Sequence, residues 1–247
     1  DFGAIGDGST DDSAAFEAAD AAANGRTILV SEGVFRLAND VTLESKVQFE
    51  GTVTQPANKR FIMQKEYNYE NYLNAFGDET IAFKKAFQAL LNFADHESLD
   101  LGGRRITLDE PLDMQSADPS RTSYATRRAI RNGQFQASDS SGWNATVVTS
   151  QGTYSTANPT RLSNVINIAN VKVGSLVEGA GVGREVYVSG VNVGGKIAYL
   201  SAPLYDAAGT QNFTFRRFKY LLDFSGFQSL SQFVLDDIEF QGNGYAS

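Results

Sequence analysis

The sequence predicts a mostly β protein in which short strands stack as a solenoid-like sheet. Its 23 glycines and 2 methionines, with only 20% charged residues, suit many short strands joined by turns better than a helical bundle. Apolar and polar residues alternate in short bursts, such as VFRL at 34–37 and RITL at 105–108. A helix-strand unit also recurs at an offset of 71 residues, which indicates a repeated supersecondary unit. Each coil of such a stack buries its inner side chains on its neighbours.

The first copy of this unit begins with DFGAIGDGSTDDSAAFEAA. Ser9 followed by Asp12 predicts a capping-box-like start to a helix, where acidic side chains favour the positive end of the helix dipole. A stripe of small residues continues the helix, the Asn-Gly pair at 24–25 predicts a left-handed stop, and a strand follows at 26–30. A calcium loop of the EF-hand type does not fit, because the sixth position counted from Asp7 is Asp12 rather than glycine.

The second copy has a heavier apolar stripe. Its FGDE at 76–79 matches IGDG at 5–8, and the residues that follow predict a second helix ending near Asp95 and His96. The apolar positions of this helix are Phe83, Phe87, Leu90 and Ala94. A strand is expected at 98–103.

Two later segments, AIRNGQFQA at 129–137 and FVLDDIEFQGNG at 233–244, predict further strands of the stack. Their inward-pointing residues are Ile130, Phe135, Phe233, Leu235, Ile238 and Phe240. The Val- and Gly-rich stretch between them alternates nearly throughout, which predicts antiparallel hairpins. One face of these hairpins would consist of Val171, Val173, Val186, Val188, Ile197 and Tyr199.

Composition restricts the chemistry. The formal charge of -8 argues against a protein that binds nucleic acid through contacts to the phosphates. With no cysteine and a single histidine, His96, the chain lacks the residues for thiolate or multi-histidine metal sites, and no metal and no cofactor is predicted. No apolar run is long enough to cross a membrane. Any catalysis would depend on carboxylates, Lys, Arg or Tyr.

Three segments carry a family resemblance. The opening residues, the following ILVSEGVFRLANDVTLESKVQFEG and the later strands resemble right-handed parallel β-helices of the pectate-lyase superfamily, most strongly over 1–53, less so over 74–137 and again at 228–247. LDLGGRRITLDEPLDM looks more like bacteriophage tailspikes and capsule depolymerases. The resemblance implies a mostly β fold, a right-handed parallel β-helix with N-terminal capping helices and a small inserted antiparallel β module.

This resemblance implies a domain organisation. The expected segments are a first cap helix with initial strands at 1–56, a connector at 57–73, a second cap-like repeat with first coils at 74–144, the inserted module at 145–227 and a resumed coil at 228–247. The resumed coil has no cap of its own. The sequence is therefore expected to be the N-terminal portion of a longer spike, with any catalytic coils beyond Ser247.

The function that this resemblance implies is that of a phage tailspike. Such a protein would recognise and, in full length, degrade bacterial surface polysaccharide as a homotrimer attached to other virion tail proteins, at the virion tail or outside the cell. The segment alone is expected to be inactive. A secreted polysaccharide lyase or glycoside hydrolase of the same superfamily is one alternative, and a non-catalytic structural or adhesive virion segment is another.

No catalytic residue transfers by motif, and two acids are candidates. Asp237 and Glu239 are two positions apart in a predicted strand, so their side chains would point to one face about 7 Å apart. That separation falls near the roughly 6.5–9.5 Å spacing of an inverting glycosidase pair. Asp236 would not join them, because neighbouring strand residues face opposite ways. The alternative is an ordinary polar outer face.

Aromatic and basic side chains are candidates for carbohydrate binding. Tyr67, Tyr69 and Tyr72 in EYNYENY, and the single tryptophan Trp143, could stack on sugar rings. Packing in a connector, or burial under the inserted module, is the alternative. Three basic clusters could hold carboxylate-bearing polysaccharide or could form ion pairs. They consist of Arg104 and Arg105, of Arg127, Arg128 and Arg131, and of Arg216, Arg217 and Lys219.

Overall fold

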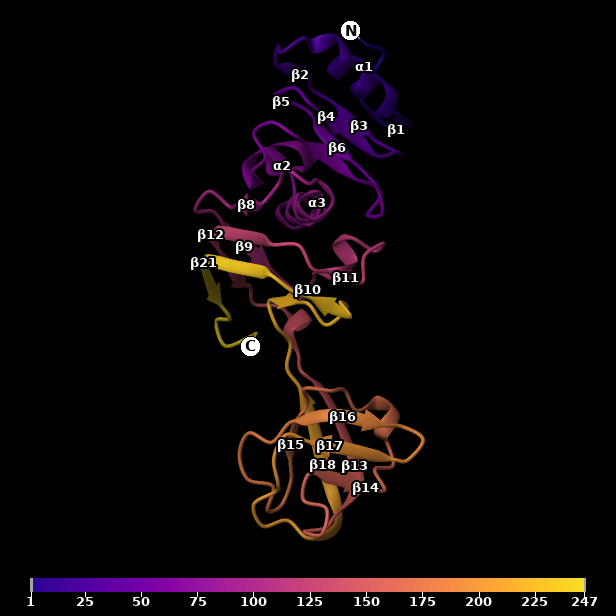
Figure 1. The fold of residues 1–247 in the computed structure, drawn as a ribbon, viewed down its shortest axis with the longest axis vertical. Helices are drawn as coiled ribbons and strands as arrows, with labels where there is room; N and C mark the ends of the chain where they lie inside the picture. Colours follow the sequence, from indigo (N-terminus) through magenta and orange to yellow (C-terminus); the bar gives the residue numbers. More distant parts are fainter. Residues whose placement is uncertain (1, 247) are drawn as a thin grey trace. The chain divides into compact units, whose positions relative to one another are not determined.

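The computed structural model describes residues 2–246, and the chain is mostly β, as predicted. It divides into two compact units. Unit 1 comprises Asp1–Asp139 and Tyr220–Gly244, and unit 2 comprises Ser140–Lys219 and Tyr245–Ser247. The strands of unit 1 pair in parallel and those of unit 2 pair antiparallel (Figure 1). Each unit has its own buried apolar side chains.

The first strands of unit 1 form two successive coils. Each of three strands pairs in parallel with the strand one coil later. The pairs are β2 (Ile28–Val30) with β5 (Val47–Phe49), β3 (Val34–Arg36) with β6 (Thr52–Thr54), and β4 (Val41–Leu43) with β7 (Phe61–Met63). β1 (Asp7–Asp11) adds a further parallel strand beside β3. The alternating pattern requires one row of side chains in these strands to point inward, and its members Phe35, Leu43 and Val53 are buried.

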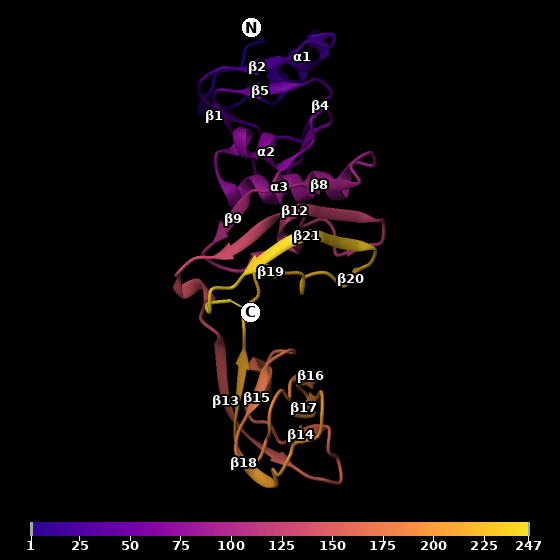
Figure 2. The same cartoon turned by 90° about the vertical axis from the view of Figure 1, so that its left-hand side faces the viewer.

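The later strands of unit 1 repeat the arrangement. The long strand β12 lies between β21 on one side and the shorter β8 and β9 on the other (Figure 2). Shorter parallel pairs join β10 to β19 and β11 to β20. The bounds are β8 (Ser98–Asp100), β9 (Arg105–Leu108), β10 (Leu112–Asp113), β11 (Ser123–Tyr124), β12 (Arg128–Ala137), β19 (Leu222–Asp223), β20 (Ser229–Leu230) and β21 (Phe233–Gln241).

Unit 2 is inserted between β12 and β19. Because β19 pairs with β10 at Leu222 and Leu112, the chain is already back in the parallel stack by residue 222. The sequence predicts the module at 145–227, whereas the compact unit runs over 140–219. The difference arises because β19 and β20 are two-residue strands, too short to show a period in the sequence.

Unit 2 is a six-stranded antiparallel sheet in the order β15-β18-β13-β14-β17-β16. Its strands are β13 (Thr146–Tyr154), β14 (Arg161–Ser163), β15 (Leu176–Glu178), β16 (Val188–Asn192), β17 (Ile197–Leu200) and β18 (Gly209–Arg217). The expected inner face is partly wrong. Val171, Val186 and Val188 are buried, but Val173 and Tyr199 are exposed. In β17 the buried residues are Ala198 and Leu200, so the true phase is shifted by one residue.

Among residues 2–246, three α-helices lie in unit 1, and three short 3₁₀ helices connect strands. The α-helices are α1 (Ser13–Ala23), α2 (Tyr69–Phe76) and α3 (Glu79–Asn92), and the 3₁₀ helices are η1 (Gln115–Ala117), η2 (Ser141–Trp143) and η3 (Ile168–Asn170). α1 and α3 were predicted. α2 was not predicted, because residues 69–73 fell in the expected connector. At the start of α2 the Asn68 side chain accepts a hydrogen bond from the Asn71 amide, and Gly77 ends the helix with a left-handed φ of 69°.

The acidic opening turn is a hydrogen-bonding device rather than a capping box. Ser9 lies in β1, and α1 begins only at Ser13. The Asp12 carboxylate accepts the backbone N–H groups of Ile5 and Gly6 at 2.7 and 3.2 Å, so it fixes the N-terminal segment instead of capping the helix. Hydrogen bonds from Ser13 and from the Ala38 amide lower the pKa of Asp11 to about 2. The acids therefore tie the opening turn to α1 and to the first coil.

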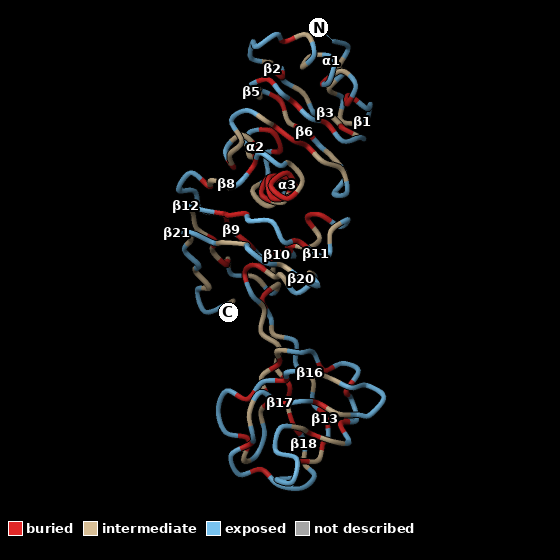
Figure 3. The backbone as a smooth tube through the Cα atoms, in the orientation of Figure 1, coloured by how far each residue is buried: buried red, intermediate tan, exposed pale blue. Residues whose placement is uncertain are grey.

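α3 is buried on nearly all sides (Figure 3). It packs against β7 on one side and against β8 and β9 on the other, so it lies between the two sets of parallel strands. Even its polar residues Lys85 and Gln88 are buried. The Lys85 ammonium donates to Gln55 Oε1 at 2.9 Å and to the carbonyls of Pro56 and Lys59 at 2.7 and 2.5 Å. A helix expected as an end cap is thus the centre of the unit 1 core.

Candidate functional site

The outer face of β12 and β21 contains the acids that the sequence singled out. Both strands adopt a left-handed conformation at one residue, Asn132 with φ of 57° and Asp237 with φ of 52°. Arg131 pairs with Asp236 and Gly133 with Ile238, so the two left-handed residues lie at the same level of the stack. Both strands bend there.

Gly133 makes this bend possible. A Cβ at this position would lie 2.6 Å from Leu101 Cβ and 3.0 Å from the Arg104 carbonyl oxygen. Such distances are too short for any side chain, so only glycine lets β12 approach the turn before β9 this closely. The bend therefore requires glycine at position 133, because any larger residue would collide with the turn before β9.

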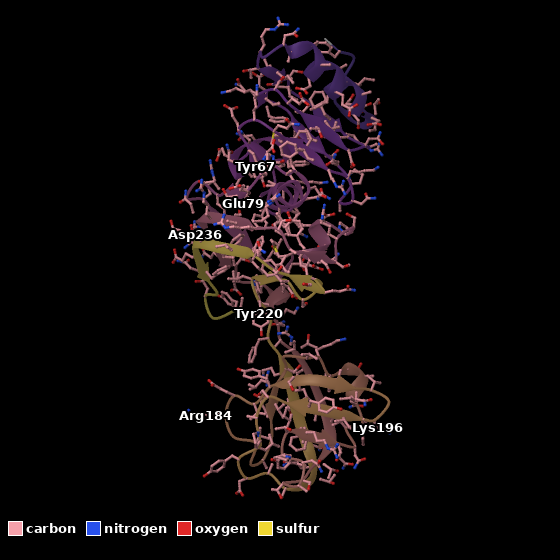
Figure 4. The ribbon with its side chains drawn as sticks, in the orientation of Figure 1. Tyr67, Glu79, Arg184, Lys196, Tyr220 and Asp236 are labelled. Carbon is pink, nitrogen blue, oxygen red and sulfur yellow. The ribbon has the colours of Figure 1, made fainter. Side chains whose placement is uncertain are left out.

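The bend removes the basis for pairing Asp237 with Glu239. Simple alternation does not hold across a left-handed residue, so the expected spacing does not apply. The Glu239 carboxylate accepts hydrogen bonds from Gln134 Nε2 at 2.8 Å and Gln241 Nε2 at 2.7 Å. The Asp237 carboxylate has no hydrogen-bond or ion-pair partner among residues 2–246. Asp236 lies at the outer edge of β21 (Figure 4).

A second polar cluster lies beside this bend. Asp100 accepts a hydrogen bond from Asn132 Nδ2 at 3.0 Å and pairs with Arg131, whose Nε lies 3.3 Å from its carboxylate. Together with Gln134 and Glu239, these residues form what we call the polar outer face. Its planar amide, guanidinium and carboxylate groups both donate and accept hydrogen bonds, which is the chemistry that sugar hydroxyls require.

The inner side of the same strands is apolar. Phe135 is fully buried, contacts Phe83 of α3 at a ring-centroid distance of 5.1 Å, and stacks with Phe240 at 5.9 Å. Leu235 and Phe240 were expected to be buried, yet Phe240 is 46% exposed and Leu235 is also exposed. The inner residues of the two strands lie opposite each other, Ile130 opposite Leu235 and Phe135 opposite Phe240. Burial therefore falls from β12 to β21, although the alternation is the same.

Two of the three candidate tyrosines are core residues, and the third, Tyr67, is half-buried. Tyr69 and Tyr72 are fully buried, and their hydroxyls donate to the carbonyls of Glu79 and Phe61 at 3.2 and 2.9 Å. Burial raises the pKa of both phenols above the ordinary value. Tyr67 donates to the Ala86 carbonyl at 2.6 Å (Figure 4). These rings pack the α2–α3 region, so sugar stacking on Tyr69 and Tyr72 is not available in this fold.

His96 belongs to the same aromatic cluster. Its ring stacks on Tyr67 at a centroid distance of 3.7 Å and contacts Phe93 at 4.5 Å. Burial lowers the pKa of His96 to about 4, so the imidazole is neutral near pH 7. Among residues 2–246, no three His, Cys, Asp or Glu side chains lie close enough together to hold a metal ion.

Trp143 is also inaccessible. It ends η2 and is 4% exposed, so neither face of the indole is presented to solvent. Its Nε1 has no hydrogen-bond partner in the described part of the chain. A stacking role for Trp143 would need a rearrangement of this segment.

Most of the basic clusters are engaged within the protein. Arg104 forms a bidentate pair with Glu70, and Arg216 pairs with Glu178 at 3.2 Å. Arg128 is buried and donates to the carbonyls of Leu90 and Phe93 at the C-terminal end of α3. Such contacts satisfy the last carbonyls of a helix. These arginines have structural partners.

The exposed tyrosines lie elsewhere, in unit 2. Tyr187, Tyr199 and Tyr205 are all exposed, and Tyr205 is 88% exposed. The alternation in the sequence predicts Tyr199 on the inner face, so it does not single out these tyrosines as exposed. The short segment IAYLS at 197–201 contained a usable signal, since Ala198 and Leu200 can fill the inner face equally well and leave the tyrosine outside.

Comparisons with known proteins agree with the parallel stack of unit 1. The family model described as rhamnogalacturonase A/epimerase, pectate lyase-like, matches residues 1–245. A comparison with curated proteins found no match. No helix among residues 2–246 is long and apolar enough to span a membrane. Since the family model covers nearly the whole chain, the protein belongs to the pectate-lyase-like rhamnogalacturonase A/epimerase family.

Proposed function

We propose that this protein recognises a bacterial surface polysaccharide on a right-handed parallel β-helix. The observation that carries the proposal is the repeated parallel pairing of unit 1, in which β2, β3 and β4 each pair with the equivalent strand one coil later. Membership of a pectate-lyase-like family supports action on polysaccharide. The polar outer face of β12 and β21 supplies suitable hydrogen-bonding groups on such a stack.

Recognition is better supported than cleavage by the acids described above. Both oxygens of Glu239 accept hydrogen bonds from glutamine side chains, so this carboxylate is already engaged within the strand pair. Asp237 lies at the bend, and its carboxylate has no partner within residues 2–246. We therefore assign Glu239 to the positioning of Gln134 and Gln241 and leave Asp237 as the residue to test.

The proposal extends to a homotrimeric phage tailspike that acts at the virion tail or outside the cell with other tail proteins. Its support is the likeness of LDLGGRRITLDEPLDM to tailspikes. A secreted lyase or hydrolase of the same superfamily is the competing proposal. Light scattering coupled to size exclusion separates them, because the tailspike requires a trimer and the secreted enzyme a monomer.

Cleavage is tested directly with purified capsular polysaccharides. The chain is incubated with each glycan while reducing ends, chain length and the absorbance of unsaturated uronates are followed. Binding without cleavage would agree with recognition alone. Cleavage abolished by Asp237→Asn but not by Asp236→Asn, the same change at the neighbouring exposed acid of β21, would instead give Asp237 a catalytic role. Absence of both binding and cleavage for every glycan would refute the proposed function.

A further inference from the structure

Charge is divided unevenly between the two units. Unit 2 contains seven basic residues and three acidic ones, a formal charge of +4, although the whole chain has a formal charge of -8. The basic residues are Arg161, Lys172, Arg184, Lys196, Arg216, Arg217 and Lys219, and the acidic ones are Glu178, Glu185 and Asp206. A cationic unit in an acidic protein attracts anionic partners to that unit.

Four of these cations have no partner for their side chains among residues 2–246. They are Arg161, Lys172, Arg184 and Lys196. By contrast, Arg216 pairs with Glu178, and Lys219 donates to the Gly142 carbonyl at 2.8 Å. Figure 4 shows Arg184 and Lys196 at the surface of unit 2. The positive charge of unit 2 is thus mostly unneutralised.

One of the four cations lies beside an exposed tyrosine. In the antiparallel strands β14, β17 and β16, Tyr199 is paired with Arg161 on one side and with Gly190 on the other. A Cβ at Gly190 would lie 3.4 Å from Tyr199 Cδ2, so the tyrosine ring lies against the glycine backbone. Tyr199 nevertheless remains 42% exposed. A ring that covers a glycine in this way presents its other face to solvent.

Tyr187 extends this face. The Tyr187 amide donates to Ser201 Oγ at 2.9 Å, and the Ser201 amide donates to the Tyr187 carbonyl at 2.8 Å, so the two residues lie opposite each other. Ser201 is two residues beyond Tyr199 and therefore points to the same side of the sheet. Diagonal neighbours of this kind lie about 7–8 Å apart. Tyr187, Tyr199, Ser201 and Arg161 form what we call the tyrosine face.

We propose that the tyrosine face binds an anionic, uronate-bearing polysaccharide. Pyranose rings stack on Tyr199 and Tyr187, and a uronate carboxylate pairs with the free guanidinium of Arg161. Two rings on one side of a sheet match successive sugars of one chain, and the charge of +4 on unit 2 selects an acidic glycan over a neutral one. This inference rests on the proposed function and gives it a substrate class and a site.

The test measures the affinity of the whole chain for alginate, polygalacturonate and hyaluronate, with dextran as the neutral comparison. We expect at least one of the anionic polymers to bind and dextran not to bind. Tyr199→Ala is expected to weaken binding roughly threefold to tenfold, the loss of one stacked ring. Arg161→Gln is expected to weaken it about tenfold or more and to reduce its salt dependence.

Two matched variants control for the chemistry. Tyr205→Ala removes a tyrosine that is 88% exposed in a loop, and Arg184→Gln removes another unpaired arginine of unit 2. Both are expected to keep the affinity of the unaltered chain. Circular dichroism and the emission of buried Trp143 show whether each variant is folded.

The outcomes separate this inference from the proposed function. If Arg184→Gln weakened binding as much as Arg161→Gln, and Tyr205→Ala as much as Tyr199→Ala, binding would not depend on the positions of these groups, and the tyrosine face would be refuted. Undiminished binding by Tyr199→Ala and Arg161→Gln would refute it as well, while recognition of polysaccharide would stand. Binding of dextran alone, or of neutral capsules alone, would overturn the anionic class. Failure to bind any polysaccharide would refute the proposed function itself.

Discussion

Replacing Lys85 by methionine perturbs the centre of unit 1 at a single point. The Lys85 side chain is buried in α3, and its ammonium donates to Gln55 Oε1 and to the carbonyls of Pro56 and Lys59 within 2.9 Å. Lys85→Met keeps the length of the aliphatic chain but removes all three hydrogen bonds. The acceptors lie on the segment between β6 and β7, so the change detaches that segment from α3.

The size of the effect follows from these contacts. A hydrogen bond to a charged group contributes about 1.5–3 kcal/mol net, and a buried acceptor that is left without a donor costs about 1–3 kcal/mol. Burial lowers the pKa of Lys85 to about 8, which shows that the ammonium carries a desolvation cost that methionine does not. We therefore expect a loss of about 2–4 kcal/mol in the free energy of unfolding of unit 1.

The assay follows the two units separately. All three α-helices lie in unit 1, so helical circular dichroism reports on unit 1, whereas Trp143 fluorescence reports on unit 2. Lys85→Met should shift the urea transition of the helical signal and leave the Trp143 transition in place. Lys84→Met changes a neighbouring half-buried lysine whose side chain has no partner in the described part of the chain, and it should alter stability by no more than about 0.5 kcal/mol. Equal effects of the two substitutions would refute the anchoring role of Lys85.

Two further predictions concern unit 1. The pKa of His96 is lowered from 6.5 to about 4, so the folded chain binds this proton more weakly than the unfolded chain, and stability falls as the pH drops from about 6.5 toward 4. In urea unfolding across this range, His96→Gln should lose about 1–2 kcal/mol less unfolding free energy on acidification than the unaltered chain. An identical pH slope for the two proteins would contradict the burial argument. Gly133→Ala should destabilise unit 1 by about 1–3 kcal/mol and lower the melting temperature measured by circular dichroism, because the new Cβ would collide with Leu101 and the Arg104 carbonyl. Gly194→Ala, in an open turn, should have little effect. Similar melting temperatures for the two variants would show that the bend tolerates a side chain.

Local patterns predicted the repeated framework of unit 1 well. The apolar stripe of α3 and the alternation of β12 each depend on neighbours a few residues away, and both elements formed close to their predicted positions. The helix ends earlier than predicted, at Asn92, and Ala94 of the expected stripe is exposed. The left-handed stop of α1 at Asn24 was likewise predictable from an Asn-Gly pair. In these places local preference and tertiary packing favour the same structure.

The predictions of buried and exposed side chains that were wrong share one physical cause: the burial of a side chain depends on residues that are distant in the sequence. Lys85 is buried only because the segment at 55–59 offers it three acceptors, and nothing near Lys85 in the sequence shows this. Tyr69 and Tyr72 lie in a segment whose composition is typical of exposed sugar-binding residues, yet as residues of α2 they face the core and are buried. Tyr199 was misplaced because alternation gives a period without giving the buried phase.

The measurement that tests the central claim most directly is isothermal titration calorimetry of the intact chain against capsular polysaccharides purified from a panel of bacteria. We expect saturable binding to at least one anionic capsule, weakened by salt and by Arg161→Gln. Heats no larger than dilution for every capsule in the panel would contradict polysaccharide recognition as the function of this protein.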